Sequence, residues 1–255
     1  MRLDVHNSEI PRLCLSCEAR HRGVCGVLEP AQLVRLSRHT IRREVAPDTE
    51  LLASGELITR YSNILTGVVK LTMTLPDGRQ QIVGLQFAPD FLGRPFAETS
   101  EISAHAAGVV RLCSFPREFL EELMRESPDL HQRLHAQALR ELDEARGWML
   151  TLGRKSASER VASFLLLVAR HADPEEQGET TFDIPLGRAD IADFLGLTEE
   201  TVSRQVTTLR KAGVISLETS RSILVTNYEA LRIAAGEGSQ DAPSSRRSGR
   251  TQSRS

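Results

Sequence analysis

The stretch from Leu186 to Gly213, LGRADIADFLGLTEETVSRQVTTLRKAG, has the pattern of two short helices joined by a tight turn. Gly196 and Leu197 supply the turn. Thr198 can cap the second helix, because its hydroxyl can accept a backbone N–H that the first helical turn leaves unpaired. Apolar residues at helical spacing give each helix one face to bury. These residues are Ile191, Ala192 and Leu195, and then Val202, Val206 and Leu209. The stretch therefore predicts a helix-turn-helix.

The polar face of the second helix carries short groups and one arginine. It is formed by Glu200, Ser203, Arg204 and Thr207. A carboxylate can accept from cytosine, and a guanidinium can bond guanine through two hydrogen bonds, so these residue types can read base edges in a major groove. With Arg188 at the start of the first helix, they are the candidate DNA-binding residues. The alternative is an αα-hairpin buried in a core. The alternative is disfavoured because an ordinary solvated helix usually carries Lys/Glu pairs, whereas the exposed positions of this helix carry short polar groups and one arginine.

Length and charge restrict the class of protein. The 255 residues suit one large domain or two ordinary ones. No apolar run approaches 18 residues, and the first residues lack a signal pattern, so we expect a cytoplasmic protein without a membrane span. The formal net charge is −2. Affinity for DNA must therefore come from local placement and from the pairing of two copies.

The chain has four cysteines, three of them close together in CLSCEARHRGVC. They are Cys14, Cys17, Cys25 and Cys113. In a cytoplasmic protein such a group is more often metal-binding or redox-active than disulfide-bonded. We expect an irregular N-terminal loop, in which Cys14 and Cys17 can point at one metal centre.

The fourth ligand is open at this stage. Cys113 shares one face of a predicted strand with Val109 and Arg111, and a lone strand cysteine is most often a small buried hydrophobe. A four-ligand cluster would need Cys113, because it is the only other cysteine. His21 is the competing ligand and would suit zinc better.

The remaining chain divides into recognisable segments. Residues 30–39 predict a short helix, and residues 40–115 predict short strands in a small antiparallel barrel or jelly roll. Pro76-Asp77-Gly78 is a strong hairpin turn. A half-buried strand before it is indicated by the alternation of Val69, Leu71, Met73 and Leu75.

Residues 117–153 predict a long helix with a possible break at Ser127-Pro128. Its apolar stripe comprises Leu134, Ala138, Leu142, Ala145, Met149 and Leu152. A long narrow stripe after a barrel with its own core predicts pairing with a second copy. The alternative is packing on the same chain's barrel.

The C-terminal part continues with a helix over Lys155–Ala172, the strand TFDIPL, the helix-turn-helix, a two-stranded wing and a last helix over Tyr228–Ala235. The fold class is α+β. The predicted parts are a cysteine-rich segment (1–29), a β-barrel sensor domain (30–116), a dimerisation helix (117–153), a winged helix-turn-helix (154–236) and a disordered tail (237–255).

This order of parts resembles the CRP/FNR superfamily of bacterial transcription regulators over roughly residues 10–235. The E-x-x-S-R signature of the FNR group is present as Glu200 to Arg204. The C-x2-C-x7-C spacing of Cys14, Cys17 and Cys25 resembles FnrN/FixK-like regulators.

The resemblance implies an oxygen-sensing regulator, with activator as the expected class, rather than an enzyme. Its four cysteines would ligate a [4Fe-4S] cluster, and the intact cluster would favour a homodimer that binds a palindrome of TTGAT-type half-sites. Oxygen would convert or destroy the cluster and release the DNA. Glu200 would face C or A of the complementary strand, Ser203 the T positions and Arg204 the G. RNA polymerase would be a further partner.

Two departures from the family patterns matter. The segment LGRPFAETSEIS lacks the Gly-Glu-Leu of the cyclic-nucleotide branch, so we expect no cyclic nucleotide effector. Ala145 stands where the FNR pattern has an acidic residue that opposes pairing, so we expect a tighter dimer and a blunted oxygen response. The rival interpretations are a zinc- or thiol-based redox regulator of the same fold, and an iron–sulfur electron carrier or enzyme. The last would not bind DNA sequence-specifically.

Overall fold

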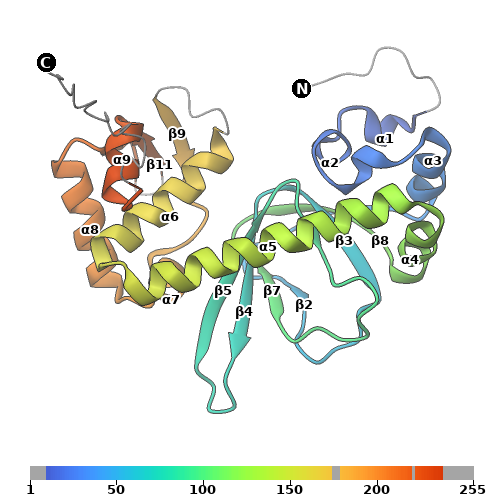
Figure 1. Ribbon diagram of the computed structural model, residues 1–255, viewed down its shortest axis with the longest axis horizontal. Coiled ribbons are helices and arrows are strands. Elements are labelled where there is room, and N and C mark those ends of the chain that lie inside the picture. The colour runs from blue at the N-terminus through green and yellow to red at the C-terminus, as the bar shows by residue number, and fades with distance from the viewer. Residues whose placement is uncertain (1–9, 174–178, 220–221, 238–255) are drawn as a thin grey trace, which may run out of the picture.

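The computed structural model describes residues 10–173, 179–219 and 222–237 (Figure 1). A group of short helices, two β-sheets, a long helix and a smaller C-terminal unit follow one another along the chain (Figure 1). The long helix runs from the sheets to the C-terminal unit. Almost all of the predicted tail lies outside the described residues.

The N-terminal segment is a series of helical turns. Its elements are α1 (Arg12–Leu15), α2 (Glu18–His21), the 3-10 turn η1 (Val24–Val27) and α3 (Pro30–Arg38). The expected helix over 30–39 is confirmed, but the expected irregular loop is wrong. Backbone N–H groups bond carbonyls three residues earlier, as from Cys14 to Pro11 (2.7 Å) and from Arg20 to Cys17 (3.0 Å).

The sensor domain contains two antiparallel four-stranded sheets. The strands are β1 (Ile41–Val45), β2 (Glu50–Leu52), β3 (Arg60–Thr66), β4 (Val68–Thr74), β5 (Gln80–Phe87), β6 (Phe91–Leu92), β7 (Ser103–Ala106) and β8 (Val110–Pro116). They are ordered β1-β8-β3-β6 and β2-β7-β4-β5. Residues such as Ile64, Val69, Ala104 and Leu112 from both sheets form one buried cluster. The arrangement is a jelly roll rather than a closed barrel.

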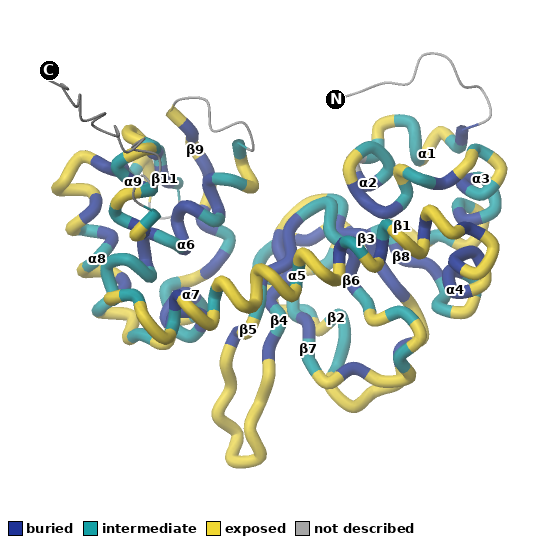
Figure 2. Tube along the Cα trace, viewed as in Figure 1, coloured by how far each residue is buried: buried dark blue, intermediate teal, exposed yellow. Residues whose placement is uncertain are grey.

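The hairpin between β4 and β5 turns at Pro76-Asp77-Gly78, as predicted. Gly78 has a φ of +88°, and an Asp77 carboxylate oxygen accepts from the Arg79 backbone N–H (3.1 Å). The predicted half-buried alternation is wrong, because Val68, Val69 and Lys70 are all buried at the base of β4. Met73 is 50% exposed, because the tip of the hairpin projects from the body of the protein (Figure 2).

The predicted long helix is interrupted at Ser127-Pro128, where a break was expected, and so forms two helices. They are α4 (Arg117–Glu126) and α5 (Pro128–Arg154), and they meet at Ser127. The Ser127 side chain caps α5 by accepting from the Leu130 N–H (3.4 Å), and Pro128 occupies the first position of α5. Proline is tolerated there because the first turn of a helix does not use that N–H.

The C-terminal unit is a winged helix-turn-helix. It comprises α6 (Ala157–Ala172), β9 (Thr180–Asp183), α7 (Arg188–Leu195), α8 (Glu199–Lys211), β10 (Ile215–Leu217), β11 (Ser222–Val225) and α9 (Tyr228–Ala234). The wing was predicted as two strands, but its sheet has the order β10-β11-β9. The segment TTFD of β9 supplies the third strand, whose pairing partner no local sequence pattern indicates.

One buried cluster joins the C-terminal unit to the sensor domain. Ile82 and Leu85 of β5 belong to the same cluster as Phe194 of α7. Trp148 of α5 packs on Phe194 with ring centroids 4.5 Å apart. The helix-turn-helix is therefore held against the β4–β5 hairpin. Among the described residues, no helix is long and apolar enough to cross a membrane.

Candidate functional site

The four cysteines line one cavity between the N-terminal helices and the first sheet. Cys14 and Cys17 come from α1 and the turn after it, Cys25 from η1 and Cys113 from β8. Leu13, Leu33 and Leu36 supply apolar walls. The fold thus brings the N-terminal cysteines to the strand cysteine.

Three neighbouring strands present a row of side chains to this cavity. Arg42 of β1 and Asn63 of β3 both pair with Cys113 of β8 in the strand register. Residues opposite one another in adjacent strands point to the same face of the sheet. The Asn63 amide nitrogen donates to the Cys25 sulfur (3.2 Å). The sheet therefore contributes a cation, a thiol and an amide side by side.

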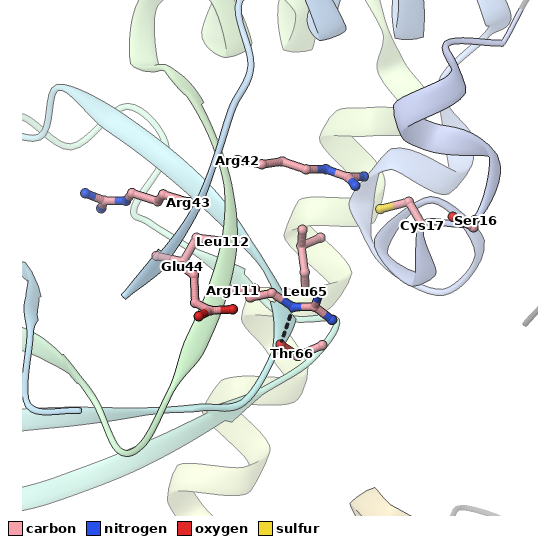
Figure 3. Close-up of a pocket in the computed structure, with 9 residues that line it drawn as sticks. All are labelled: Ser16, Cys17, Arg42, Arg43, Glu44, Leu65, Thr66, Arg111 and Leu112. Carbon is pink, nitrogen blue, oxygen red and sulfur yellow. Dashed lines mark hydrogen bonds between the residues drawn. The ribbon is translucent and has the colours of Figure 1, made fainter. Parts of the chain in front are cut away.

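Arg42 connects the sheet to the N-terminal segment. Its guanidinium donates to the Leu13 carbonyl and contacts the Cys113 thiol. Cys17 and Arg42 also line an open pocket on the outer side of the cavity, and Figure 3 shows the Arg42 side chain reaching toward Cys17 while Arg43 points away. Cys17 and Arg42 thus form the wall between the cysteine cavity and the surface.

Burial favours the neutral thiol at three of the four cysteines. Desolvation, reinforced by the neighbouring thiols, raises the pKa of Cys25 and of Cys14 and raises the pKa of Cys113 to about 11. Nearby Arg42 opposes the shift at Cys14 and Cys113. Thiolates need a positive charge to persist in such a site, and a bound metal centre supplies one.

The donor set fits a cluster better than a single ion. Within the described part of the chain, no three or more Cys, His, Asp or Glu side chains converge on one ion position. Zinc requires four ligands at about 2.0–2.3 Å around one point, whereas each thiolate of a [4Fe-4S] cluster binds a different iron. Four thiols surrounding a shared cavity match the second case. The His21 ring lies 3.5 Å from the Leu15 carbonyl, and His21 is not among the cavity-lining residues.

The helix-turn-helix has the predicted local chemistry. Thr198 caps α8 by accepting from the Thr201 N–H (3.2 Å), and Gly196 ends α7 with a φ of +60°. The predicted apolar stripe of α8 is buried. Glu200, Ser203 and Arg204 are exposed on the other face.

The two other candidate DNA-binding residues, Thr207 and Arg188, are less available for contact with DNA. The Thr207 hydroxyl donates to the Ser203 carbonyl of its own helix (2.9 Å). Arg188 is half-buried at the start of α7, and burial lowers the pKa of its guanidinium.

The stripe on α5 is exposed over its middle section. Leu142 is 44% and Met149 72% exposed, and Ala138 and Ala145 are exposed beside them. Leu134 instead belongs to the chain's own core, and Leu152 is half-buried. Leu139 and Leu150 are also exposed beside the stripe. They were missed because the predicted spacing selected their neighbours Ala138 and Met149.

These features define a transcription regulator, with a DNA-reading helix held against a sensor domain. A family model for the Crp-like helix-turn-helix domain matches residues 159–233, and one for the cyclic nucleotide-binding domain matches residues 42–127. The chain belongs to the CRP/FNR family, in its FNR/FixK group. It is a transcription regulator, not an enzyme.

Three similar proteins support this assignment. A "Probable transcriptional activator" of Rhizobium leguminosarum bv. viciae is 54% identical over 90% of this chain and 98% of its own length. The transcriptional activator protein FnrL of Cereibacter sphaeroides is 41% identical over 91% of this chain and 96% of its own length. The solved structure of FixK2 from Bradyrhizobium japonicum has a TM-score of 0.70 at 30% identity and covers 76% of this chain and 96% of its own.

Proposed function

We propose that the chain is an oxygen-responsive transcription activator. Cys14, Cys17, Cys25 and Cys113 would hold a [4Fe-4S] cluster that promotes dimerisation and binding to a palindromic FNR-type DNA site, and oxygen would destroy the cluster. The observation that carries the proposal is the convergence of all four cysteines on one apolar cavity.

The bound cluster would supply a covalent connection between the N-terminal helices and β8. That segment already rests on α5. Arg133 of α5 donates to the Arg22 carbonyl (2.6 Å), and Val24 shares a buried cluster with Leu130 and Leu134 of α5. A change in how the N-terminal helices sit on the sheet is therefore transmitted directly to the first half of α5.

A second copy would cover the exposed stripe of α5. Burial of a large apolar side chain is worth about 1.5–3 kcal/mol, so a few such contacts across a two-fold axis suffice for a dimer. Two α8 helices on that axis would then enter major grooves about one DNA turn apart, roughly 34 Å. Because one copy has little net charge to attract DNA, occupancy would follow dimerisation.

The exposed face of α8 would read the half-site. Arg204 would bond guanine, Ser203 would contact the T positions, and Glu200 would accept from the complementary strand. As an activator, the DNA-bound dimer would present its sensor domain to RNA polymerase.

Metal analysis of the anaerobically purified protein tests the proposal. We expect about four iron and four sulfide per chain, with a visible absorption that bleaches in air. Stoichiometric zinc without sulfide would support the zinc-based regulator instead. Protein without any metal, in which air only oxidises the thiols, would support the thiol switch.

A further inference from the structure

Asn63 is an unusual residue for its place in the fold. It is completely buried between the first sheet and the N-terminal helices, and it lines the cysteine cavity together with Leu33 and Leu36 of α3. Its carbonyl oxygen has no hydrogen-bond partner among the described residues. A buried polar group without a partner is costly, so some compensating interaction is expected at this position.

The interaction that Asn63 makes is with sulfur. Its amide nitrogen lies 3.2 Å from the sulfur of Cys25 and donates to it. A neutral thiol is a weak acceptor, whereas hydrogen bonds to charged acceptors are roughly twice as strong as those between neutral groups. The amide is therefore suited to a sulfur that carries negative charge, as a metal-bound thiolate does.

The strand register explains why Asn63 reaches this sulfur. Asn63 stands opposite Cys113 on β8, so both side chains face the cavity from the rigid sheet. Cys25 comes from a short 3-10 turn, which has few hydrogen bonds of its own to fix the side chain. The sheet thus provides one ligand directly and steadies another through an amide.

We propose that Asn63 is a positioning residue for the cluster. Its amide holds the Cys25 sulfur toward the cavity, stabilises the negative charge on that sulfur and thereby slows the loss of the cluster in oxygen. This inference rests on the proposed function. Hydrogen bonds to cluster sulfurs also raise reduction potentials, which gives a readout independent of DNA binding.

The test compares wild type with Asn63→Leu, which keeps the size of the side chain and removes the donor. We expect the visible absorption to bleach about tenfold faster at a fixed oxygen concentration, because a hydrogen bond to a charged group contributes at least that factor. We expect the reduction potential to fall by about 59 mV, the equivalent of a tenfold ratio for a one-electron couple.

The matched control is Gln86→Leu. Gln86 is also a buried amide with an unpartnered oxygen, but it bonds Phe91 and Glu141 instead of sulfur. Asn63→Val serves as a second variant if Asn63→Leu does not fold, because valine also lacks a donor and β-branched residues suit a strand.

The outcomes separate the two proposals. Equal bleaching rates and potentials for wild type and the Asn63 variants would overturn the role of Asn63 while leaving the cluster in place. The same acceleration of bleaching in Gln86→Leu would overturn the role of Asn63, because the effect would then come from general destabilisation of the fold. Absence of iron and sulfide from wild type would overturn the proposed function, and this inference with it.

Discussion

Lys70 of β4 bonds Asp190 of α7, with its ammonium nitrogen 3.1 Å from each carboxylate oxygen. The same nitrogen lies 2.9 Å from a carboxylate oxygen of Asp48. A second contact follows one turn along α7, where Asp193 accepts from the Ile82 backbone N–H (3.2 Å). The first helix of the helix-turn-helix is thus tied to the sensor hairpin by two of its own carboxylates. DNA-binding geometry and sensor geometry are therefore coupled through this hairpin.

Lys70→Met should loosen that connection. The Lys70 side chain is only 10% exposed, so its removal leaves Asp190 without its partner and should cost about 1–3 kcal/mol. Urea denaturation measures the loss, and hydrogen exchange should quicken in α7 and at Ile82. Arg79→Met is the control, because its ion pair with Asp77 is exposed and worth about 0–1 kcal/mol. Equal destabilisation by both variants would show that the Lys70 bond does not couple the domains.

Glu144→Gln should stabilise the protein in a pH-dependent manner. Glu144 lies on an exposed stretch of α5, but partial desolvation of its carboxyl group and the nearby charges of Asp90 and Glu141 raise the pKa of Glu144 above its ordinary value of 4.5. The folded state therefore binds this proton more tightly than the unfolded state, and the ionised carboxylate opposes folding at neutral pH. The variant's gain in the free energy of unfolding should be full at pH 7. It should fade as the pH drops through the raised pKa toward 4.5. Denaturation at several pH values measures it, and a gain that does not depend on pH contradicts this explanation.

Ala145→Asp should weaken the dimer. Ala145 is exposed in the middle of the α5 stripe, so two aspartates would face each other across the two-fold axis. Like charges brought together at an interface oppose association. Anaerobic sedimentation should show more monomer, and bleaching in air should abolish DNA binding more readily. Gln132→Asp adds the same charge on the opposite side of α5, where Gln132 is also exposed, and should change neither property. An unchanged dimer in Ala145→Asp would exclude this face as the interface.

Arg204→Ala should relax sequence preference at one base pair. Arg204 is exposed on α8, and a bidentate contact to guanine is worth about 1–3 kcal/mol of discrimination. Binding titrations should show that loss only on sites with the guanine. Arg210→Ala, at the end of the same helix, should weaken all sequences alike. If Arg204→Ala also behaves this way, Arg204 contacts phosphate.

Local chemistry made much of the fold predictable. Thr198 and Gly196 mark the helix-turn-helix, and Pro76-Asp77-Gly78 marks a hairpin, because each depends on neighbouring residues alone. The third strand of the wing and the exposure of Met73 depend on what distant segments pack against them. Helical turns around Cys14 were missed because their length is too short for a periodic pattern.

Some residues of the candidate site are also recognisable from the sequence, whereas others are identified only by the tertiary fold. The four cysteines stand out by chemistry, since the chain has no others. Asn63 and Arg42 acquire meaning only from the register of β1, β8 and β3, which no local pattern encodes. The bond from Lys70 to Asp190 likewise joins residues that only the tertiary fold brings together.

Cys113→Ser should abolish the cluster as completely as Cys14→Ser. Both residues line the cavity, one from the sheet and one from the N-terminal helices, so either change leaves one iron without its thiolate. Iron and sulfide analysis after anaerobic reconstitution measures the loss, and far-UV circular dichroism verifies the fold. His21→Ala is the matched control, since His21 lies in the same segment but outside the cavity lining, and it should keep full iron content. Retention of the cluster in Cys113→Ser, together with its loss in His21→Ala, would transfer the fourth ligand to His21.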